Sequence, residues 1–361
     1  MASSVYIHIP FCRNICTYCD FCKLFLHDSW INKYLDALEK EVSDRYLDDK
    51  IKTIYIGGGT PSALEIKYLK KLFEIITKFS LEDEYEFTFE CNLQDINEEL
   101  LLFLKQNKVN RLSIGIQSFN QNNLKFMGRE ANYKDAYNKI QLCRKIGFLN
   151  INVDLIYALP YESIHILKKD LRLFNKLKVD HISTYSLMIE PNTYLSYQQI
   201  QPISEDIDAK MYKIICKYLK RKKYNHYEIS NFSKANYYSK HNLTYWNNEE
   251  YYGFGLGASG YVMDIRYDNT KNLNTYLKGD YVNEKEILSL DEKMNYEIIL
   301  GLRKTEGINV KKFYEKYHIN IQNKYKINEL LSSKDLIYKK GNIFINPDRL
   351  YVMNEILVKL V

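Results

Sequence analysis

Six short β-rich runs, separated by longer segments with helical spacing, constrain the fold of this chain more than any other feature. In the longer segments, such as Tyr68–Ile76, apolar residues return at intervals of three and four. The runs begin 26 to 47 residues apart, which is the length of one strand with one helix. This pattern predicts an α/β fold with a parallel sheet covered by helices. The predicted strands are Val5–Ile9, Lys52–Ile56, Tyr85–Cys91, Arg111–Ile116, Asn150–Tyr157 and His181–Leu187.

The residues at the ends of these strands distinguish between two arrangements of such a sheet. Six units are too few for an eight-stranded barrel, which leaves an incomplete (β/α)6 barrel or an open doubly wound sheet. Parallel barrels assemble their active sites from the carboxyl ends of several strands. Unusual residues stand at or after the end of every predicted strand, so we expect the incomplete barrel. These residues are Cys12–Cys19, Gly57–Pro61, Glu90–Asn92, Gln117–Phe119, Asp154–Pro160 and Ile189–Asn192.

The chain changes character after the sixth strand. A long helix is expected from about residue 205 to 222, which would complete a barrel domain at residues 1–222. Residues 223–285 are irregular and aromatic, and we expect them to form a connecting segment folded across the barrel. Residues 286–361 read as three helices, a hairpin turning at Gly341-Asn342 and a final helix. This order predicts a small winged-helix-like α+β domain.

Winged-helix domains serve either to bind nucleic acid or simply to pack against another domain. The predicted helices between residues 291 and 333 lack a concentrated basic face, and the net charge of +6 comes from interleaved charges. Nucleic acid is therefore not an expected partner.

No targeting or membrane segment is recognisable. Met1–Ser4 leads directly into the first strand without a basic or an apolar region, and no run approaches the roughly 18 apolar residues of a membrane span. Seven cysteines, an odd number clustered towards one end, do not resemble a disulfide framework. We expect a cytoplasmic protein, because a reducing compartment preserves thiolate ligands.

Three closely spaced cysteines form the strongest candidate site. Thiolates of Cys12, Cys16 and Cys19 on one loop suit a soft metal, either zinc or an iron–sulfur cluster. Zinc is the weaker interpretation, because neither four structural ligands nor a catalytic set with histidine is visible. A cubane cluster held by three thiolates would keep one iron open for an outside ligand. Cys22 is a fourth candidate, and buried cysteines acting as small apolar residues are the plain alternative.

The glycine-rich segment Gly57–Pro61 lies between the second strand and the following helix. Glycine allows close approach of the backbone to a ligand, Thr60 can cap the helix, and Pro61 suits its first position. A tight turn without a ligand would use similar residues, but three consecutive glycines exceed what it needs. Free amides at the barrel mouth would hold the amino-acid end of a small cofactor.

Several charged or polar residues share positions near the strand ends. Glu90 and Asp154 lie within apolar runs, where a carboxylate needs a partner such as a ligand's amino group or ribose hydroxyls. Arg129, in a loop after Met127-Gly128, could reach an anionic group. Each of these residues, and Gln117, would alone be read as solvated surface. Their common position makes them candidates for one binding site.

Two further motifs have alternative interpretations. His241, in a polar loop beside Tyr245-Trp246, is either a hydrogen-bonded structural histidine or a solvent-reachable axial ligand for haem. His8, in the first strand, is expected to point into the barrel. Gly255–Gly260 matches the dinucleotide-binding spacing, but neither a preceding buried strand nor a following helix is predicted. A packing or turn role is therefore expected there.

Together, these segments resemble the radical S-adenosylmethionine (SAM) enzymes, specifically their HemN/HemW branch. The resemblance extends over nearly the whole chain, and the cysteine spacing is its most specific part. It is carried by Tyr6–Cys12, Cys16–Phe21, Gly57–Pro61, Arg111–Phe119, Asn152–Tyr157, His181–Ser186, Ile189–Thr193, Tyr227–Phe232, His241–Trp246 and Asn295–Arg303.

The resemblance implies two cofactors. Cys12, Cys16 and Cys19 would hold a [4Fe–4S] cluster whose open iron takes the amino and carboxylate groups of SAM. In an active enzyme of this kind, an electron from the cluster cleaves SAM to a 5′-deoxyadenosyl radical. The residues that match SAM-lining positions of the family are Tyr6, Tyr18, Gly58, Gly59, Thr60, Glu90, Gln117, Arg129 and Asp154.

The branch holds oxygen-independent coproporphyrinogen III dehydrogenases and haem chaperones. The dehydrogenases have a longer N-terminal extension before the cysteines. They also have a fourth cysteine two positions after the third, where this chain has Phe21. The role of that fourth cysteine is therefore not transferred to Cys22. His241-Asn-x-x-Tyr-Trp246 is the motif that the resemblance associates with haem, with His241 as its ligand. We therefore expect a chaperone that binds haem and delivers it to an acceptor protein. Dehydrogenase activity is the alternative, and no catalytic residue is assigned. The resemblance also allows an electron donor of the flavodoxin or ferredoxin type, and a homodimer.

Overall fold

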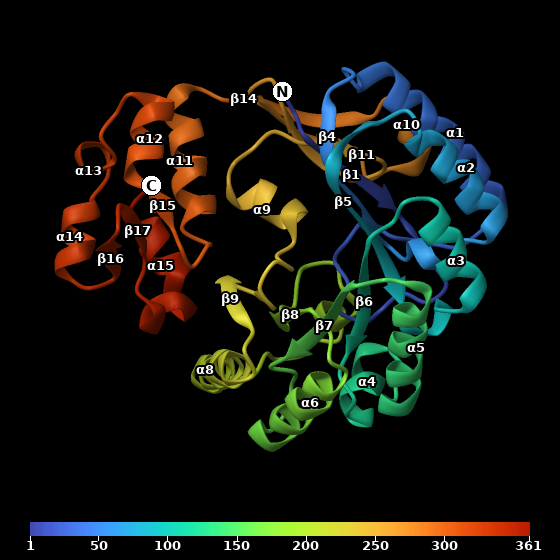
Figure 1. Cartoon of the computed structure of the whole chain (residues 1–361), viewed down its shortest axis with the longest axis horizontal. Helices are drawn as coiled ribbons and strands as arrows, with labels where there is room; N and C mark the ends of the chain where they lie inside the picture. Colours follow the sequence, from blue (N-terminus) through green and yellow to red (C-terminus); the bar gives the residue numbers. More distant parts are fainter.

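A curved parallel sheet forms the centre of the computed structural model, which describes residues 1–361. Six strands lie side by side in chain order and pair in parallel, as the sequence pattern predicts. They curve into an arc that does not close, so the incomplete (β/α)6 barrel is confirmed (Figure 1). The strands are β1 (Ser4–Ile9), β4 (Lys50–Gly58), β5 (Ser80–Asn92), β6 (Arg111–Gln117), β7 (Asn150–Tyr157) and β8 (His181–Ser186).

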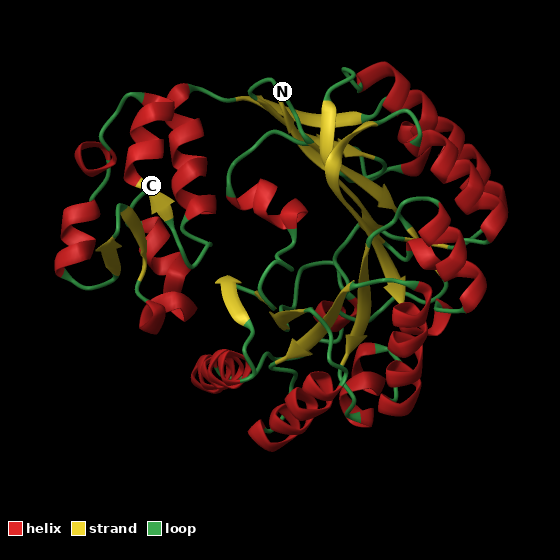
Figure 2. Ribbon diagram, viewed as in Figure 1, coloured by secondary structure: helices red, strands yellow, loops and turns green.

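Helices cover the outer side of the arc (Figure 2). Asn97, Asn132 and Ser163 cap the N-termini of three of them with side-chain oxygens that accept backbone N–H groups. Gly128 and Gly147 end two helices with positive φ angles, for which glycine is the favoured residue. The helices are α1 (Asp28–Arg45), α2 (Ile66–Ile76), α3 (Glu98–Gln106), α4 (Gln121–Met127), α5 (Tyr133–Ile146), α6 (Ile164–Lys176) and α8 (Glu205–Arg221).

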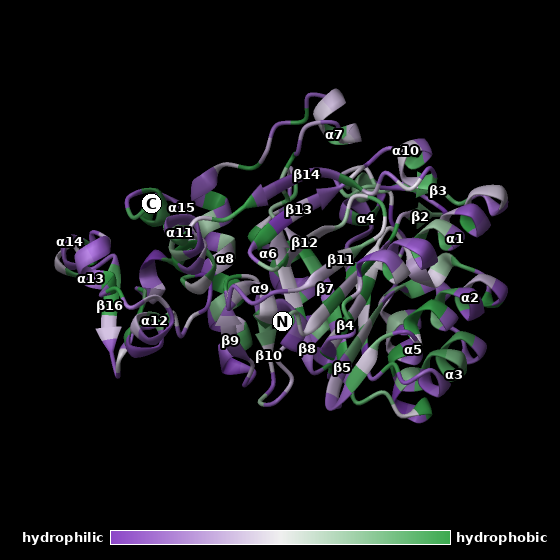
Figure 3. Ribbon diagram, turned by 90° about the horizontal axis from the view of Figure 1, so that it is seen from above, coloured by the Kyte–Doolittle hydropathy of each residue, from purple (hydrophilic) through white to green (hydrophobic).

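The two faces of the sheet differ in polarity. Outward-facing residues such as Ile54, Ile56, Leu112 and Ile114 are fully buried beneath the helices. Figure 3 shows hydrophobic residues along the central strands, with many hydrophilic residues on the covering helices. The inner face is largely polar, whereas the sequence pattern suggests near-continuous apolar strands. Its residues include Tyr6, His8, Tyr55, Glu90, Arg111, Ser113, Asn152, Asp154, His181 and Ser183.

Residues 223–285 extend the central sheet at both edges, so the prediction of an irregular segment is wrong. β9 (Asn225–Glu228) and β10 (Asn231–Ser233) follow β8 in antiparallel pairing, and β11 (Tyr252–Phe254) pairs in parallel with β1. An open sheet presents unpaired backbone groups at its edges, which these short strands satisfy. The domain boundaries at 222 and 285 remain a prediction.

Other elements of this segment lie beside the sheet. β12 (Ser259–Val262), β13 (Ile265–Asn269) and β14 (Val282–Ile287) form a separate antiparallel sheet, and α10 (Leu273–Leu277) lies between the last two strands in the chain. α9 (Lys240–Trp246), predicted as a loop, is a short helix inside the arc (Figure 1).

The Gly255–Gly260 motif also differs from the prediction, because buried β11 does precede it. However, β12 follows instead of a helix, so the dinucleotide interpretation is still rejected. Gly255 has φ of +100°, and a Cβ there would lie 2.5 Å from Tyr34 Oη. The motif serves close packing.

The C-terminal residues form a winged-helix-like arrangement with four helices before the hairpin, one more than predicted. Lys340 and Gly341, both with positive φ, make the hairpin turn, whereas Asn342 belongs to the second strand and pairs with Lys339. The elements are α11 (Leu290–Gly301), β15 (Ile308–Asn309), α12 (Val310–Tyr317), α13 (Ile321–Lys324), α14 (Ile327–Ser332), β16 (Leu336–Lys339), β17 (Asn342–Ile345) and α15 (Met353–Val358).

All seven cysteines are free, in agreement with the predicted absence of a disulfide framework. No helix of the chain combines the length and the apolar character that crossing a membrane would need.

Candidate functional site

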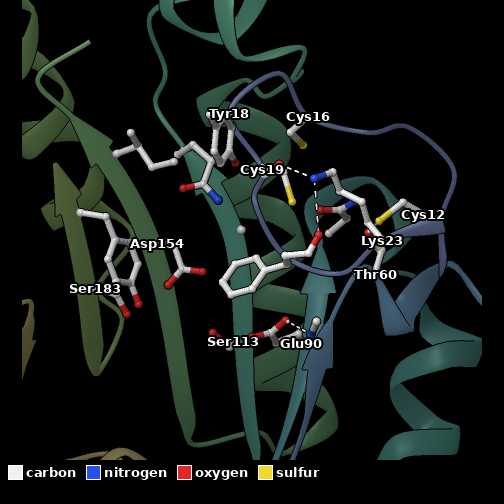
Figure 4. Close-up of a pocket in the computed structure, with 18 of the residues that line it drawn as sticks. Cys12, Cys16, Tyr18, Cys19, Lys23, Thr60, Glu90, Ser113, Asp154 and Ser183 are labelled. Atoms are coloured by element: carbon white, nitrogen blue, oxygen red, sulfur yellow. Dashed lines mark hydrogen bonds between the residues drawn. The ribbon is translucent and has the colours of Figure 1, made fainter. Parts of the chain in front are cut away.

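A cavity of about 420 Å³ opens at the carboxyl ends of the parallel strands. It is bounded by the cysteine loop, the glycine-rich segment and residues of β5 to β8, as Figure 4 shows for ten labelled side chains. The structure thus brings most of the predicted site residues together. Those that line the cavity are Cys12, Cys16, Tyr18, Cys19, Gly58, Gly59, Thr60, Glu90, Gln117, Arg129 and Asp154.

The cysteine loop is fixed at its base and at its middle. β2 (Phe11–Cys12) pairs with β3 (Leu24–Phe25), which closes the loop between them. Thr17 fixes the middle, because its N–H donates to Met127 O at 3.3 Å and its hydroxyl donates to Phe126 O at 2.9 Å. The three thiols are therefore held above the strand ends by contacts with a distant part of the chain.

The donor set on this loop fits an iron–sulfur cluster. Cys12 is buried, Cys16 and Cys19 are half-buried, and the Thr60 hydroxyl donates to Cys12 Sγ at 3.4 Å. Burial raises the pKa of Cys19 to about 11, so metal binding must displace its proton. No three His, Cys, Asp or Glu side chains of the chain are grouped to hold a single metal ion. Cys22 is not among the cavity-lining residues.

The backbone amides of Gly58 and Gly59 in the glycine-rich segment are not free, contrary to the prediction. Gly58 N–H donates to Glu90 Oε2 at 3.1 Å and Gly59 N–H donates to Ile9 O at 2.8 Å, so both amides are occupied within the fold. Glycine is needed because a Cβ on Gly59 would lie 2.7 Å from the Pro10 carbonyl carbon. Pro61 occupies the first turn of a short 3-10 helix, as predicted, but the Thr60 side chain does not cap it.

Two carboxylates face the cavity, Glu90 from β5 and Asp154 from β7, which lie on either side of β6. Glu90 accepts hydrogen bonds from Tyr55 Oη at 2.7 Å and from Gly58 N–H, while Asp154 accepts one from Asn152 Nδ2 at 2.8 Å. Burial raises the pKa of Glu90 to about 7, against the opposing effect of the Tyr55 hydrogen bond. Burial also raises the pKa of Asp154. Each carboxylate keeps acceptor capacity for a cationic or hydroxyl-bearing ligand.

Three polar side chains at this site have buried atoms without hydrogen-bond partners: Gln117 Oε1, Arg129 Nε and Arg111 Nε. Gln117 has φ of +74° and lies at an irregularity in the pairing of β6 with β7, which is typical of a functional position. Arg129 Nη1 donates to Asn92 Oδ1. Unsatisfied buried donors and acceptors of this kind call for a polar ligand or for water.

Tyr6 does not line the cavity, although it matches a SAM position of the family. Its hydroxyl lies 2.9 Å from His8 Nδ1, and its ring stacks at a tilt on Tyr55 with centroids 6.1 Å apart. His8 points into the barrel, as predicted, with Nε2 at 2.7 Å from the Cys22 carbonyl oxygen. Tyr6 and His8 therefore support the cavity wall from behind.

His241 lies within the barrel, so of its two interpretations the structure agrees with the hydrogen-bonded histidine and not with the solvent-reachable imidazole. Its exposed fraction is 1%, and its two ring nitrogens lie 2.8 Å from Thr53 Oγ1 and 2.7 Å from Tyr245 Oη. Burial lowers the pKa of His241 to about 3, and the Arg111 charge acts in the same direction. The imidazole is therefore neutral and hydrogen-bonded on both sides. Its role as a haem ligand remains a prediction.

Several cavity residues were not singled out from the sequence. Apart from Lys23 in the cysteine loop and Asn242 in α9, they lie on strands β4 to β8 at alternating positions of the inner face, so polar residues at a period of two within apolar runs were the available signal. Asn152 connects them, because its amide donates to Ser113 Oγ at 2.9 Å and its oxygen accepts from Ser183 Oγ at 3.1 Å. The additional residues include Lys23, Tyr55, Asn92, Arg111, Ser113, Asn152, Ser183, Tyr185 and Asn242.

Comparisons with known proteins agree with this geometry. Residues 6–174 match the Radical SAM superfamily. The protein described as "Heme chaperone HemW" from Lactococcus lactis is 40% identical, covering 99% of this chain and 97% of that protein, and its namesake from Bacillus subtilis is 39% identical over 87% and 86%. The structure titled coproporphyrinogen III oxidase (HemN) from Escherichia coli superposes with a TM-score of 0.86 at 20% identity, over 98% of this chain and 89% of that chain, which shows the fold. The chain belongs to the HemW family of the radical SAM superfamily.

Proposed function

We propose that this protein is a haem chaperone, which binds SAM and a [4Fe–4S] cluster in its barrel, binds haem, and delivers the haem to an acceptor protein. The observation that carries the proposal is the similarity, over nearly the whole chain, to relatives described as haem chaperones. It is supported by the cysteine loop and the His241–Trp246 segment, which both contribute residues to one cavity.

The cavity residues divide the binding of the cofactors between them. Cys12, Cys16 and Cys19 would hold the cluster, which when bound would supply an electron to SAM. Glu90 provides the acceptor for the amino group of SAM, and Arg129 provides a guanidinium for its carboxylate. The remaining SAM contacts are assigned to Tyr6, Tyr18, Gly58, Gly59, Thr60, Gln117 and Asp154, with Tyr6 acting from behind the cavity wall.

Anaerobic reconstitution with iron and sulfide tests the cluster assignment. Cys12→Ser, Cys16→Ser and Cys19→Ser should each lose the broad visible absorbance of the cluster, because each removes one of only three thiolates. Cys22→Ser is the matched control and should keep that absorbance, since Cys22 lies outside the cavity lining. Loss of the cluster in Cys22→Ser as well would contradict the three-ligand assignment.

Titration with haem tests the proposed function directly. The reconstituted protein should produce a shifted Soret band, and His241→Ala should alter the position of that band because an axial ligand is replaced. The Glu86 carboxylate, which accepts from the backbone N–H groups of Lys240 and His241, and the Ser239 cap of α9 remain in this variant, so its thermal stability serves as the control for folding. A protein with an intact cluster and no Soret shift would refute the proposal.

Coproporphyrinogen III dehydrogenase activity is the alternative. The resemblance to HemN rests on 20% identity and shows the fold alone, and Phe21 occupies the position of the additional cysteine in that type. Anaerobic incubation with SAM, a reductant and coproporphyrinogen III should yield no vinyl product. Formation of that product would replace the chaperone assignment.

Three further assignments belong to this proposal. The acceptor of haem is a protein, an electron donor of the flavodoxin or ferredoxin type reduces the cluster, and the chain acts in the cytoplasm, where its free cysteines stay reduced. Sedimentation of the reconstituted protein with and without haem tests whether it forms a homodimer.

A further inference from the structure

Gly115 of β6 is a glycine that the fold itself does not require. The chain has 14 glycines. Eight of them have positive φ angles, and at five others an added Cβ would lie less than 3.0 Å from a neighbouring atom. Gly115 belongs to neither group, because its φ is not positive and the nearest atom to an added Cβ would be Gln117 Nε2, at 3.1 Å. Another requirement therefore keeps this position free of a side chain.

The geometry of β6 does not supply that requirement. The pairing of β6 with β7 is irregular beyond Gly115, but the residue with positive φ there is Gln117, at +74°. Gly115 itself is in register with Asn92 of β5 and Asp154 of β7. Glycine inside a strand loses more conformational freedom on folding than alanine, and it often marks the close approach of a ligand. Since Gly115 lines the cavity, the space in front of it suits a ligand.

Hydrogen-bond donors border the space in front of Gly115. From the position of an added Cβ, Gln117 Nε2 lies at 3.1 Å, Arg129 Nη2 at 3.6 Å and Arg129 Nη1 at 3.7 Å. Arg129 Nε is buried and has no hydrogen-bond partner. A guanidinium and an amide nitrogen that converge on one point favour an anionic acceptor, and the planar fork of a guanidinium pairs well with a carboxylate. The chemistry of this space therefore fits a carboxylate oxygen.

We infer that Gly115 is a specificity-determining residue, whose missing side chain leaves the place for the carboxylate of SAM between Arg129 and Gln117. The inference deepens the proposed function and rests on it, because it takes SAM as the ligand of the cavity. A side chain at position 115 would stand where the carboxylate approaches the guanidinium. Among compounds related to SAM, the cavity therefore prefers those that carry the carboxylate.

Gly115→Ala tests the inference with a single methyl group. Alanine suits the backbone of this position, so the variant should unfold at an equal or slightly higher temperature than the original protein. Affinity for SAM should fall about tenfold or more, because the methyl group disrupts a hydrogen bond between charged groups. Gly147→Ala is the matched control, since its φ is +101° and it lies at the end of α5. It should unfold at a lower temperature and bind SAM unchanged.

The measurement uses the full-length protein with its cluster reconstituted under anaerobic conditions. Equilibrium dialysis gives its affinity for SAM and for decarboxylated SAM, in which a hydrogen atom replaces the carboxylate. The original protein should prefer SAM. Gly115→Ala should lose this preference, while its affinity for decarboxylated SAM should stay within about twofold of the original value, because the added methyl group meets only the part of SAM that this compound lacks.

Gln117→Ala separates the space itself from the side chain of Gln117. The methyl group of Gly115→Ala also displaces Gln117 Nε2, and that displacement could weaken binding without any contact with SAM. In the Gln117→Ala background this route is absent, and Gly115→Ala should still lower the affinity for SAM about tenfold. No further loss in this background would assign the effect to Gln117 and overturn the inference.

Two other results would also overturn the inference. An equal loss of affinity for SAM and for decarboxylated SAM in Gly115→Ala would place another part of the ligand at Gly115. An unfolding temperature as low as that of Gly147→Ala would show that the fold requires the glycine. Failure of the original protein to bind SAM, with the cluster absorbance intact, refutes the proposed SAM site itself.

Discussion

Gly58 in the glycine-rich segment offers a sharp test of how closely β1 and β4 approach each other. Its φ of +112° lies in the region that favours glycine, and a Cβ there would lie 2.4 Å from His8 Cε1. Gly58→Ala should therefore lower the unfolding free energy for two separate reasons, the strain in the backbone and the displacement of His8. The variants Gly147→Ala and His8→Ala separate these two effects.

The magnitude follows from the contacts of His8. A non-glycine residue at positive φ costs about 1–2 kcal/mol. His8 must also move, which breaks its hydrogen bonds with Tyr6 and with the Cys22 carbonyl, at about 1 kcal/mol each. Gly58→Ala should therefore destabilise the protein by about 3–4 kcal/mol. Gly147→Ala provides the backbone cost alone, because its φ is +101° and its Cβ would meet only the flexible end of Lys105, at 3.6 Å.

Thermal and urea unfolding of Gly58→Ala and Gly147→Ala measures the difference between their unfolding free energies. Gly58→Ala should be about 2 kcal/mol less stable than Gly147→Ala, the value of the two lost hydrogen bonds. In a His8→Ala background the clash disappears, and the cost of Gly58→Ala should fall to that of Gly147→Ala. Equal costs for the two glycine variants, or a cost unaffected by His8→Ala, would refute the reasoning.

Two other perturbations test the buried carboxylates. Since burial raises the pKa of Glu90 to about 7, the carboxylate ionises through neutral pH, and dialysis should find that affinity for SAM rises roughly tenfold from pH 6 to pH 8. Glu90→Gln should bind SAM weakly and without this pH dependence; a wild-type profile in that variant would contradict the assignment. Glu41, with an exposed fraction of 0%, accepts hydrogen bonds from Gly255 N–H and Tyr276 Oη and pairs with Arg45. Glu41→Ala should lower the unfolding free energy by about 3–5 kcal/mol, and a loss below about 1 kcal/mol would show that these donors find other partners.

Features encoded locally were predictable from the sequence. The six parallel strands begin and end within a few residues of their predicted bounds, apart from the earlier start of β5, because an alternation of apolar strands and amphipathic helices is written along the chain. The carboxyl ends of parallel strands meet at one edge, so residues as distant as Cys12 and Asp154 could be assigned to one site before their contacts were known.

Features that depend on pairing between distant segments were not predictable. β9, β10 and β11 are too short to show a periodic signal, and they form strands only because the open edges of the sheet supply partners. The amides of Gly58 and Gly59 are occupied for a similar reason. The register of β4 with β1 brings Ile9 within reach of Gly59, and the pairing of β4 with β5 brings Glu90 within reach of Gly58.

The sequence by itself therefore determined the barrel, the candidate cysteine loop and the family, because periodicity and cysteine spacing are properties of neighbouring residues. Only the tertiary structure decided the environment of His241. A histidine in a polar segment beside aromatic residues reads as accessible, but the fold carries that segment inside the arc, where Thr53 and Tyr245 bind both ring nitrogens. Burial depends on which distant surfaces close around a residue, and no local pattern contains that information.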